Sequence, residues 1–114
     1  MDAYDLFLER DRLSGQLSAS IKKLRENGVK AAQAEADYQV AKAAAALTLR
    51  DAGHPIGMIE LLIRGQKGVA EKRLLRDIEK VNYQTNQEHI NSVKLQLRLL
   101  EAQIEREWGQ AKRE

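Results

Sequence analysis

The chain of 114 residues has no cysteine, a single proline and few aromatic residues, which make up 4% of it. Without cysteine it can form no disulfide, no thiolate metal site and no cysteine nucleophile. Proline is excluded from helix interiors, so one proline is compatible with long uninterrupted helices. No apolar run approaches the roughly 20 residues needed to cross a bilayer. The first five residues, MDAYD, lack the basic and apolar parts of a signal peptide, and we expect a soluble cytoplasmic protein.

An excess of charge of one sign is also missing. There are 19 basic and 17 acidic residues, for a net charge of +2. Such a balance gives no overall attraction to polyanions, so local clusters must carry any binding of phosphate or nucleic acid. Charged residues nevertheless make up 32% of the chain, and alanine, leucine, glutamate, lysine, arginine and glutamine are abundant. This composition predicts an all-α fold, in one domain over residues 1–114.

One break marked by glycine and proline, Asp51–Gly57, divides the chain into two helical parts. Before it, apolar or small residues recur at steps of three, four or seven, which predicts a helix over about residues 3–51. After it we expect an elbow over about 52–67 with a short apolar helix, in which Pro55 occupies the first helical position. A second long helix follows over about 68–112. Its apolar stripe is expected at Leu74, Ile78, Val81, Thr85, Ile90, Val93, Leu97, Leu100, Ile104 and Trp108.

Two long helices of similar length with a short connection predict an antiparallel helical hairpin of the coiled-coil kind. Folding the chain at the break places Leu24 near Val93, and Ala31–Ala34 opposite Tyr83–Gln87. Trp108 is then expected to anchor the open end of the hairpin against Leu6, Phe7 or Tyr4. Asn27 and Gly28 weaken the first helix, and whether they kink it stays open.

The apolar surface predicted for this hairpin exceeds what one helix pair can bury. Leu95, Leu99 and Ala102 widen the apolar face of the second long helix, and the short helix is too apolar to remain alone in water. We therefore expect a homo-oligomer, most simply a four-helix dimer. The expected oligomer or partner interface consists of Ile56, Ile59, Leu62, Ile63, Leu95 and Leu99. The alternative is that this flank packs on a kinked first helix.

A basic cluster marks the start of the second long helix. Backbone N–H groups and the positive end of the helix dipole favour anions there, although the cluster does not have the Gly-Lys-Ser/Thr ending of a Walker A motif. The candidate ligand-binding residues are Arg64, Lys67, Lys72, Arg73, Arg76 and Tyr83. The alternative interpretation is a solvated charged face. A second basic group, at residues 22–25 and 30, would reach the first only in an oligomer.

The polar segment Tyr83–His89 interrupts the stripe of the second long helix. It would line a ligand groove opposite the alanines, or fix the register and oligomer state, as polar seam residues often do. His54 and His89 are the only histidines and form no metal-ligand pattern. No set of nucleophile, base and orienting group can be assembled. We expect no enzyme, no metal and no cofactor.

Several stretches resemble a known group of proteins. They are LSGQLSASIKKLRENG over residues 13–28, Ala36–Tyr38, Leu49–Gly53, Arg64–Gly65 and LLEAQIEREW over residues 99–108. With them the chain resembles small charged helical, coiled-coil-like proteins of unknown role from phages and prophages of Gram-positive bacteria. This resemblance implies a phage-encoded protein in a host cell, where small phage proteins act mainly by binding.

The favoured function is that of a non-enzymatic oligomeric interaction protein. In a phage setting its partner would be a host-defence protein or a component of phage recombination or replication. The alternative is a sponge that sequesters a cyclic nucleotide or another phosphorylated signal at a basic site between subunits. A further alternative is nucleic-acid binding by the same basic residues, which predicts affinity that falls steeply with salt. No membrane partner is expected.

Overall fold

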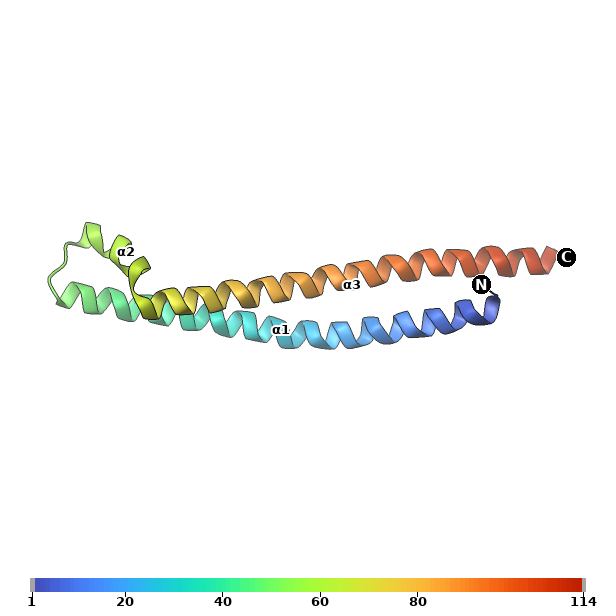
Figure 1. The fold of residues 1–114 in the computed structure, drawn as a ribbon, viewed down its shortest axis with the longest axis horizontal. Helices are drawn as coiled ribbons and strands as arrows, with labels where there is room; N and C mark the ends of the chain where they lie inside the picture. The colour runs from blue at the N-terminus through green and yellow to red at the C-terminus, as the bar shows by residue number, and fades with distance from the viewer. Residues whose placement is uncertain (1, 114) are drawn as a thin grey trace. The chain divides into compact units, whose positions relative to one another are not determined.

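The computed structural model describes residues 2–113, with side chains over residues 2–110. It contains three helices, α1 (Ala3–Asp51), α2 (Ile56–Gly65) and α3 (Lys67–Arg113) (Figure 1). Residues 2–113 include no strand. The predicted all-α fold and the order of long, short and long helices are confirmed. The bounds of both long helices agree with the expected ones to within a residue.

Both ends of α1 are capped by hydrogen bonds within a few residues of the helix end. The Asp2 carboxylate accepts a hydrogen bond of 2.9 Å from the Asp5 backbone N–H, which makes Asp2 the N-cap. At the other end, the Gly53 N–H donates to the Arg50 carbonyl at 3.0 Å, and the His54 N–H to the Leu49 carbonyl at 3.2 Å. These two bonds form a Schellman motif. Gly53 has a φ of 89°, a conformation that favours glycine.

The short helix α2 is bounded by two residues with extended backbone. Pro55 lies directly before α2 with φ −60° and ψ 142°, so the expectation that it occupies the first helical position was wrong by one residue. Its carbonyl accepts a hydrogen bond from Met58 at 2.9 Å. Gln66, with ψ 128°, separates α2 from α3, and its carbonyl accepts a hydrogen bond from Ala70 at 2.9 Å. One extended residue therefore joins the two helices.

The contacts of the chain fall into two units, which are described separately. Unit 1 comprises residues 1–25 and 84–114, and unit 2 comprises residues 26–83. Each unit pairs a segment of α1 with a segment of α3, and within each the two segments run antiparallel (Figure 1). The antiparallel pairing expected from the sequence is confirmed within each unit.

Unit 1 has an aliphatic core of the kind expected for a helix pair. Its buried residues are Leu6, Leu13, Val93 and Leu100, and the partly buried Leu17, Leu97 and Ile104 pack against them. These residues recur at steps of three, four or seven, so each lies on the face turned to the other helix. Burying a leucine or valine side chain contributes about 1.5–3 kcal/mol, and this cluster is the main source of stability in unit 1.

Unit 2 has a core in which all three helices take part. Leu49, Ile63 and Val69 are buried. The residues packed against them are Ala41, Ala45, Ala46, Ile59 and Leu62. In this unit α2 lies back along the end of α1 (Figure 1). The last turns of α1 are therefore covered by α2 and the start of α3 together.

The position of α2 changes the register between α1 and α3. The Asn86 side-chain amide donates a hydrogen bond of 3.2 Å to the Ser20 carbonyl within unit 1. Within unit 2 the Arg76 guanidinium lies 3.6 Å from the Glu35 carboxylate. The expected register, with Asn86 opposite Ala31–Ala34, was wrong by about three to four helical turns. Because α2 doubles back along α1, α3 begins opposite an earlier part of α1 than a simple turn would place it.

The seam of unit 2 also uses a different face of α3 from the expected one. Leu74, Ile78 and Val81 are exposed, so the prediction that they line the seam was wrong. The less exposed residues of this segment are Val69, Ala70, Arg73, Arg76, Glu79 and Tyr83. Opposite them, small residues of α1 leave room for these larger side chains. The seam is therefore polar, and one Glu79 carboxylate oxygen is buried with no hydrogen-bond partner among the described residues.

Candidate functional site

Two apolar patches lie on α3, one in each unit. The unit 2 patch consists of Leu74, Ile78 and Val81, and Leu74 keeps 62% of its surface exposed. Its residues are spaced by four and three, so they share one face of the helix. Since the seam with α1 uses Val69, Arg76 and Tyr83, this face points away from α1. Three large apolar side chains at helical spacing, without cover in the described chain, indicate an interaction surface.

The unit 1 patch consists of Leu95, Leu99 and Ala102. Leu99 is 63% exposed, Leu95 is similarly exposed, and Ala102 is exposed as well. The spacing of four and three is the same as in the unit 2 patch. Leu95 and Leu99 were predicted as interface residues because they widen the apolar face of this helix beyond what one partner helix can cover. Within unit 1 the core uses Val93, Leu97 and Leu100 instead, so both leucines are accessible to a partner.

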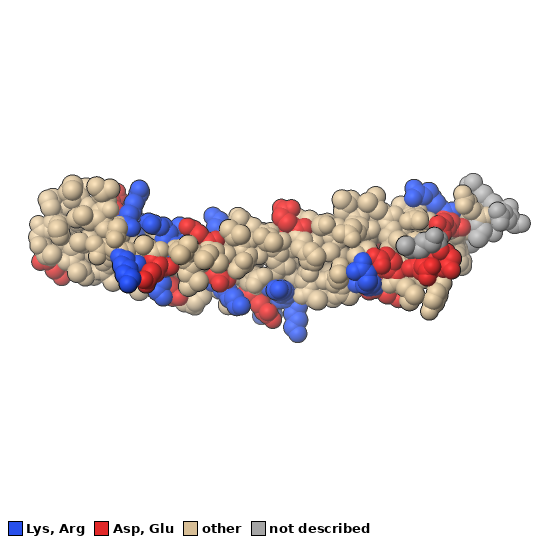
Figure 2. Space-filling model, in the orientation of Figure 1, with Lys and Arg blue, Asp and Glu red and all other residues tan. Residues whose placement is uncertain are grey.

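The predicted interface residues of α2 divide into an exposed and a covered group. Ile56 is 84% exposed, and Met58 and Leu61 are exposed too. Ile59 and Leu62 are partly buried, and Ile63 is buried against Leu49 and Val69. The prediction that Ile63 contacts a partner is therefore corrected, because its side chain belongs to the core of unit 2. In Figure 2, the left-hand end of the molecule, which contains α2, shows few charged side chains on the face in view.

A groove of about 410 Å³ lies between α1 and α2 within unit 2. Alanines of α1 and isoleucines of α2 line it, together with two charged residues and a glutamine. The residues that line it are Gln39, Lys42, Ala43, Ala46, Ile56, Ile59, Glu60 and Ile63. The groove brings together two predicted interface residues, Ile56 and Ile59, beside Lys42 and Glu60, which sequence reasoning did not single out.

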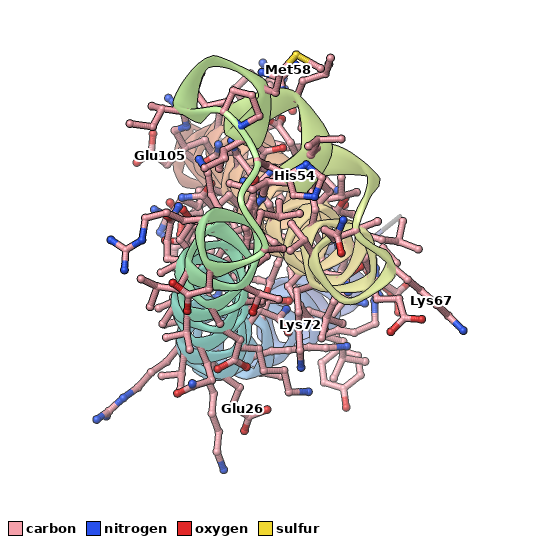
Figure 3. All side chains as sticks on the ribbon, turned by 90° about the vertical axis from the view of Figure 1, so that its left-hand side faces the viewer. Glu26, His54, Met58, Lys67, Lys72 and Glu105 are labelled. Carbon is pink, nitrogen blue, oxygen red and sulfur yellow. The ribbon has the colours of Figure 1, made fainter. Side chains whose placement is uncertain are left out.

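The predicted ligand-binding residues do not converge on one site within unit 2. Arg64, Lys67 and Lys72 are exposed, and Arg73 is half-buried. Lys67 points away from the helices (Figure 3). Arg76 lines a hollow of about 500 Å³, and none of the other five candidates lines this hollow. Its lining residues are Ala31, Ala32, Glu35, Arg76, Asp77 and Lys80. Two carboxylates and two cations balance one another there, so the hollow offers no net attraction to a phosphate.

Arg76 already has protein partners on three sides. Its guanidinium carbon lies 4.3 Å from the centre of the Tyr38 ring, within the range of a cation–π contact. Its Nε and Nη2 donate to the Asp77 carboxylate at 3.1 and 3.0 Å. This hydrogen bonding raises the pKa of Arg76, partial burial opposes the rise, and the charge of Glu35 adds to it. The structure thus gives Arg76 a place in the seam of unit 2, which the sequence pattern did not reveal.

Tyr83 packs against Gly28 inside unit 2. A Cβ atom placed on Gly28 would lie 3.3 Å from Cε2 of the Tyr83 ring, closer than ordinary packing allows. The glycine that weakens α1 by propensity therefore makes room for an aromatic ring of the seam, and α1 continues through it. Tyr83 is half-buried there, which does not favour the stacking role predicted for it in a ligand site.

Replacing Gly28 by alanine tests this contact. Alanine gains about 0.5–1 kcal/mol over glycine in a helix interior, and Gly15→Ala should give this gain because nothing lies within 4 Å of the added Cβ. Gly28→Ala should be about 1 kcal/mol less stable than Gly15→Ala, because the Tyr83 ring must move to relieve the crowding. Chemical denaturation at one protein concentration measures both. Equal gains in the two variants would show that the Tyr83 contact is not tight.

The polar segment Tyr83–His89 presents one side chain to the seam of unit 1. Asn86 is buried and bonds to the Ser20 carbonyl, whereas Thr85, Glu88 and His89 are exposed. A buried amide that must meet one carbonyl on the other helix disfavours sliding of the two helices. This arrangement favours the register interpretation over a ligand groove.

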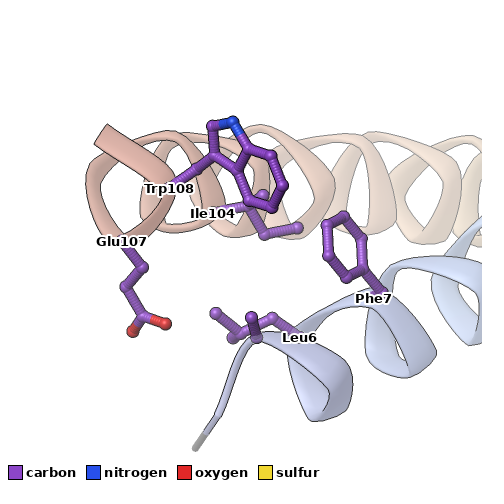
Figure 4. Close-up of a pocket in the computed structure, with 6 residues that line it drawn as sticks. Leu6, Phe7, Ile104, Glu107 and Trp108 are labelled. Atoms are coloured by element: carbon purple, nitrogen blue, oxygen red, sulfur yellow. The ribbon is translucent and has the colours of Figure 1, made fainter. Parts of the chain in front are cut away.

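At the end of unit 1, Trp108 lies beside the start of α1. Trp108, Ile104 and Glu107 of α3 stand opposite Leu6 and Phe7 of α1 (Figure 4). Together with Ala3 they line a hollow of about 130 Å³. Trp108 thus lies at the end of unit 1 where it was predicted, beside Leu6 and Phe7, but it keeps 55% of its surface exposed and is not part of the unit 1 core. Tyr4, the third predicted neighbour, is largely exposed.

Two further kinds of feature are absent from the described residues. Within them, no three side chains of histidine, aspartate or glutamate come together as ligands for a metal ion. None of the described helices combines the length and the apolar character that crossing a bilayer requires. In comparisons with protein families, curated proteins and solved structures, the chain matches none of them.

Proposed function

We propose that this chain is a non-enzymatic interaction protein that works as a homo-oligomer. One observation carries the proposal: α3 exposes an apolar patch in each unit, on residues that neither core uses. Single exposed apolar residues are normal on a protein surface, but groups at helical spacing mark interaction sites. A second copy offers the same patches, so association buries them without a further component.

The total exposed surface supports the same proposal. The chain has an accessible surface of 8551 Å², whereas a folded monomer of its mass, 12.9 kDa, is expected to expose about 6,300 Å². The excess is more than the roughly 800 Å² that each partner contributes to a stable interface. Association therefore has enough surface available on each chain, and large apolar residues are exposed on all three helices.

The partner beyond a second copy is proposed from the resemblance to phage proteins. In that setting it is a host-defence protein or a component of phage recombination or replication. Ile56, Met58 and Leu61 on α2 would contact it, because they are exposed and belong to a different helix from the two patches. The groove beside them, lined in part by Lys42 and Glu60, gives such a partner polar groups as well as apolar ones.

The alternative function, capture of a phosphorylated ligand or of nucleic acid, now depends on fewer residues. Arg64, Lys67 and Lys72 are exposed, whereas Arg76 is paired with Glu35 and Asp77. A ligand site would therefore need residues from two subunits. Melting of the wild type and of Lys67→Glu with cyclic nucleotides and short DNA tests this alternative, which requires stabilisation of the wild type alone.

Sedimentation equilibrium over a range of concentrations tests the proposed oligomer. We expect the wild type to show a mass above 12.9 kDa that rises with concentration. Ile78→Asp with Leu99→Asp should return the mass to that of one chain, because an aspartate in each patch would be buried unpaired by association. Leu47→Asp, at an exposed position of α1, is the matched control and should still associate. A wild type of single-chain mass at every concentration would refute the proposal.

A further inference from the structure

We infer that two copies of this chain pair through α3 in an antiparallel sense, so that the unit 2 patch of each copy packs on the unit 1 patch of the other. The inference rests on the proposed homo-oligomer and names its contact surface and direction. The observations behind it are the positions of the two patches along α3, their exposure and the charges at their edges.

The two patches occupy the same positions of one seven-residue repeat. Leu74, Val81, Leu95 and Ala102 are separated by seven residues or a multiple of seven, and so are Ile78 and Leu99. A repeat of seven apolar positions keeps one stripe of a helix turned towards a partner helix. α3 is a single helix over Lys67–Arg113. Its sequence therefore carries a second heptad stripe besides the one that packs on α1.

The middle of this stripe is polar and decides between parallel and antiparallel pairing. Thr85, Glu88 and Ser92 occupy the repeat positions between the two patches, and all three are exposed. In a parallel pair each residue meets its own counterpart, so Glu88 would lie against Glu88 of the partner subunit. Like charges in a seam are unfavourable. In the antiparallel register given below, the two glutamates are offset by three residues, roughly 4.5 Å along the helix, so their repulsion is reduced rather than removed.

An antiparallel register exists that brings large apolar residues together in both patches. If Ile78 faces the partner's Leu95, then Leu74, one turn earlier, faces the partner's Leu99. Numbering runs in opposite directions along the two helices, so each step back on one is a step forward on the other. By two-fold symmetry the same two contacts form a second time. In this register Glu88 lies opposite the partner's Thr85.

The edges of the stripe show charge complementarity in this direction alone. Asp77 directly precedes Ile78, and Arg98 directly precedes Leu99, so both lie on the same edge of the stripe. Both are exposed. In an antiparallel pair this edge meets the same edge of the other copy, which places Asp77 beside the partner's Arg98. In a parallel pair it would meet the opposite edge, whose residues are Leu75, Asn82, His89 and Gln96, and no opposite charges would meet.

Disulfide trapping tests whether the two α3 helices pair in the antiparallel direction. The chain has no native cysteine, so only the introduced cysteines can form a disulfide. Ile78→Cys and Leu95→Cys are prepared as separate full-length proteins, one carrying a mass tag. Mixed and oxidised, they should form a cross-linked dimer of the two different chains, because positions 78 and 95 face each other. Each variant alone should cross-link at least about tenfold more slowly, since its two cysteines would lie roughly 25 Å apart along the pair, far beyond disulfide reach.

Exchange of charges gives a second measurement on the same interface. Asp77→Lys and Arg98→Glu should each weaken the dimer by about tenfold, because each dimer contains the pair twice. The double variant should regain most of the affinity that Asp77→Lys alone loses. A parallel pair predicts no such recovery. Asp77 also accepts hydrogen bonds from Arg76, so the free energy of unfolding of each variant is measured beside its dissociation constant.

The outcomes separate this inference from the proposed function. Self-cross-linking of each variant as fast as the mixture, with a wild type that is still dimeric, would overturn the antiparallel contact and leave the homo-oligomer intact. The absence of any cross-link in a dimeric wild type would place the interface on another surface and also overturn the inference. A wild type that is monomeric at all concentrations would refute both proposals.

Discussion

Leu13→Ala is expected to lower the free energy of unfolding by about 2–4 kcal/mol. Leu13 is only 3% exposed and packs with Leu6, Val93 and Leu100 in the core of unit 1. Alanine removes the contacts of three carbon atoms and leaves a cavity that two helices close only in part. Small domains have about 5–15 kcal/mol in total, so this change removes a large share of the stability. Urea denaturation followed by far-UV circular dichroism measures it.

Leu8→Ala is the matched control for this variant. Leu8 lies on the same helix, is of the same type and is 50% exposed. Its replacement should change the stability by about 0.5 kcal/mol or less, as is usual at the surface. Both variants must be compared at one protein concentration, because association would add a concentration-dependent contribution. Similar losses in the two variants would contradict the assignment of the core of unit 1.

Ile63→Ala should have the second largest effect, again about 2–4 kcal/mol, and it should act on unit 2. Ile63 connects α2 with Leu49 of α1 and Val69 of α3. A helix as short as α2 does not hold its structure alone in water, so its order depends on this contact. Hydrogen exchange of the amides in Ile56–Gly65 should rise strongly in the variant, beyond the change that global destabilisation causes.

Leu61→Ala provides the comparison on the same helix, since Leu61 is exposed. It should leave the exchange of the α2 amides near that of the wild type. If Leu61→Ala released α2 as strongly as Ile63→Ala, then α2 would be held by its outer face. The burial of Ile63 would then not be what keeps α2 in place.

The ends of the helices were predictable because they depend on local chemistry. Asp2 caps α1 through the backbone of Asp5, and Gly53 ends it in a left-handed conformation. Both signals act within a few residues, so a sequence displays them directly. The same reasoning recognised that Gly28 does not end α1, because the apolar stripe continues past it.

The register and the seam of unit 2 were not predictable from the same patterns. α3 has two stripes with the same seven-residue repeat, one through Val69, Arg76 and Tyr83, and one through Leu74 and Val81. Hydrophobicity alone selects the second stripe. The fold uses the first because Gly28 accepts the Tyr83 ring and α2 displaces the start of α3. Both reasons depend on residues distant in sequence.

The candidate site was predictable in part, for a related reason. Leu95 and Leu99 were identified as surplus to one helix pair, and they are exposed. The residues of the unit 2 patch were predicted to pack on α1. The sequence does not show whether this patch contacts α1 or a second molecule. Arg76 was predicted to belong to the basic cluster. Its contact with the Tyr38 ring forms only in the folded seam, because the two residues are distant in sequence.

The distribution of aromatic residues gives the chain built-in optical reporters. Trp108, the single tryptophan, lies at the Leu6 and Phe7 hollow of unit 1, while Tyr38 and Tyr83 belong to unit 2. Tryptophan emission therefore follows unit 1 alone, whereas far-UV circular dichroism follows the helices of both units. Coincident melting curves from the two signals would mean that the units unfold as one cooperative body. No added label is needed to decide how far cooperativity extends along two continuous helices.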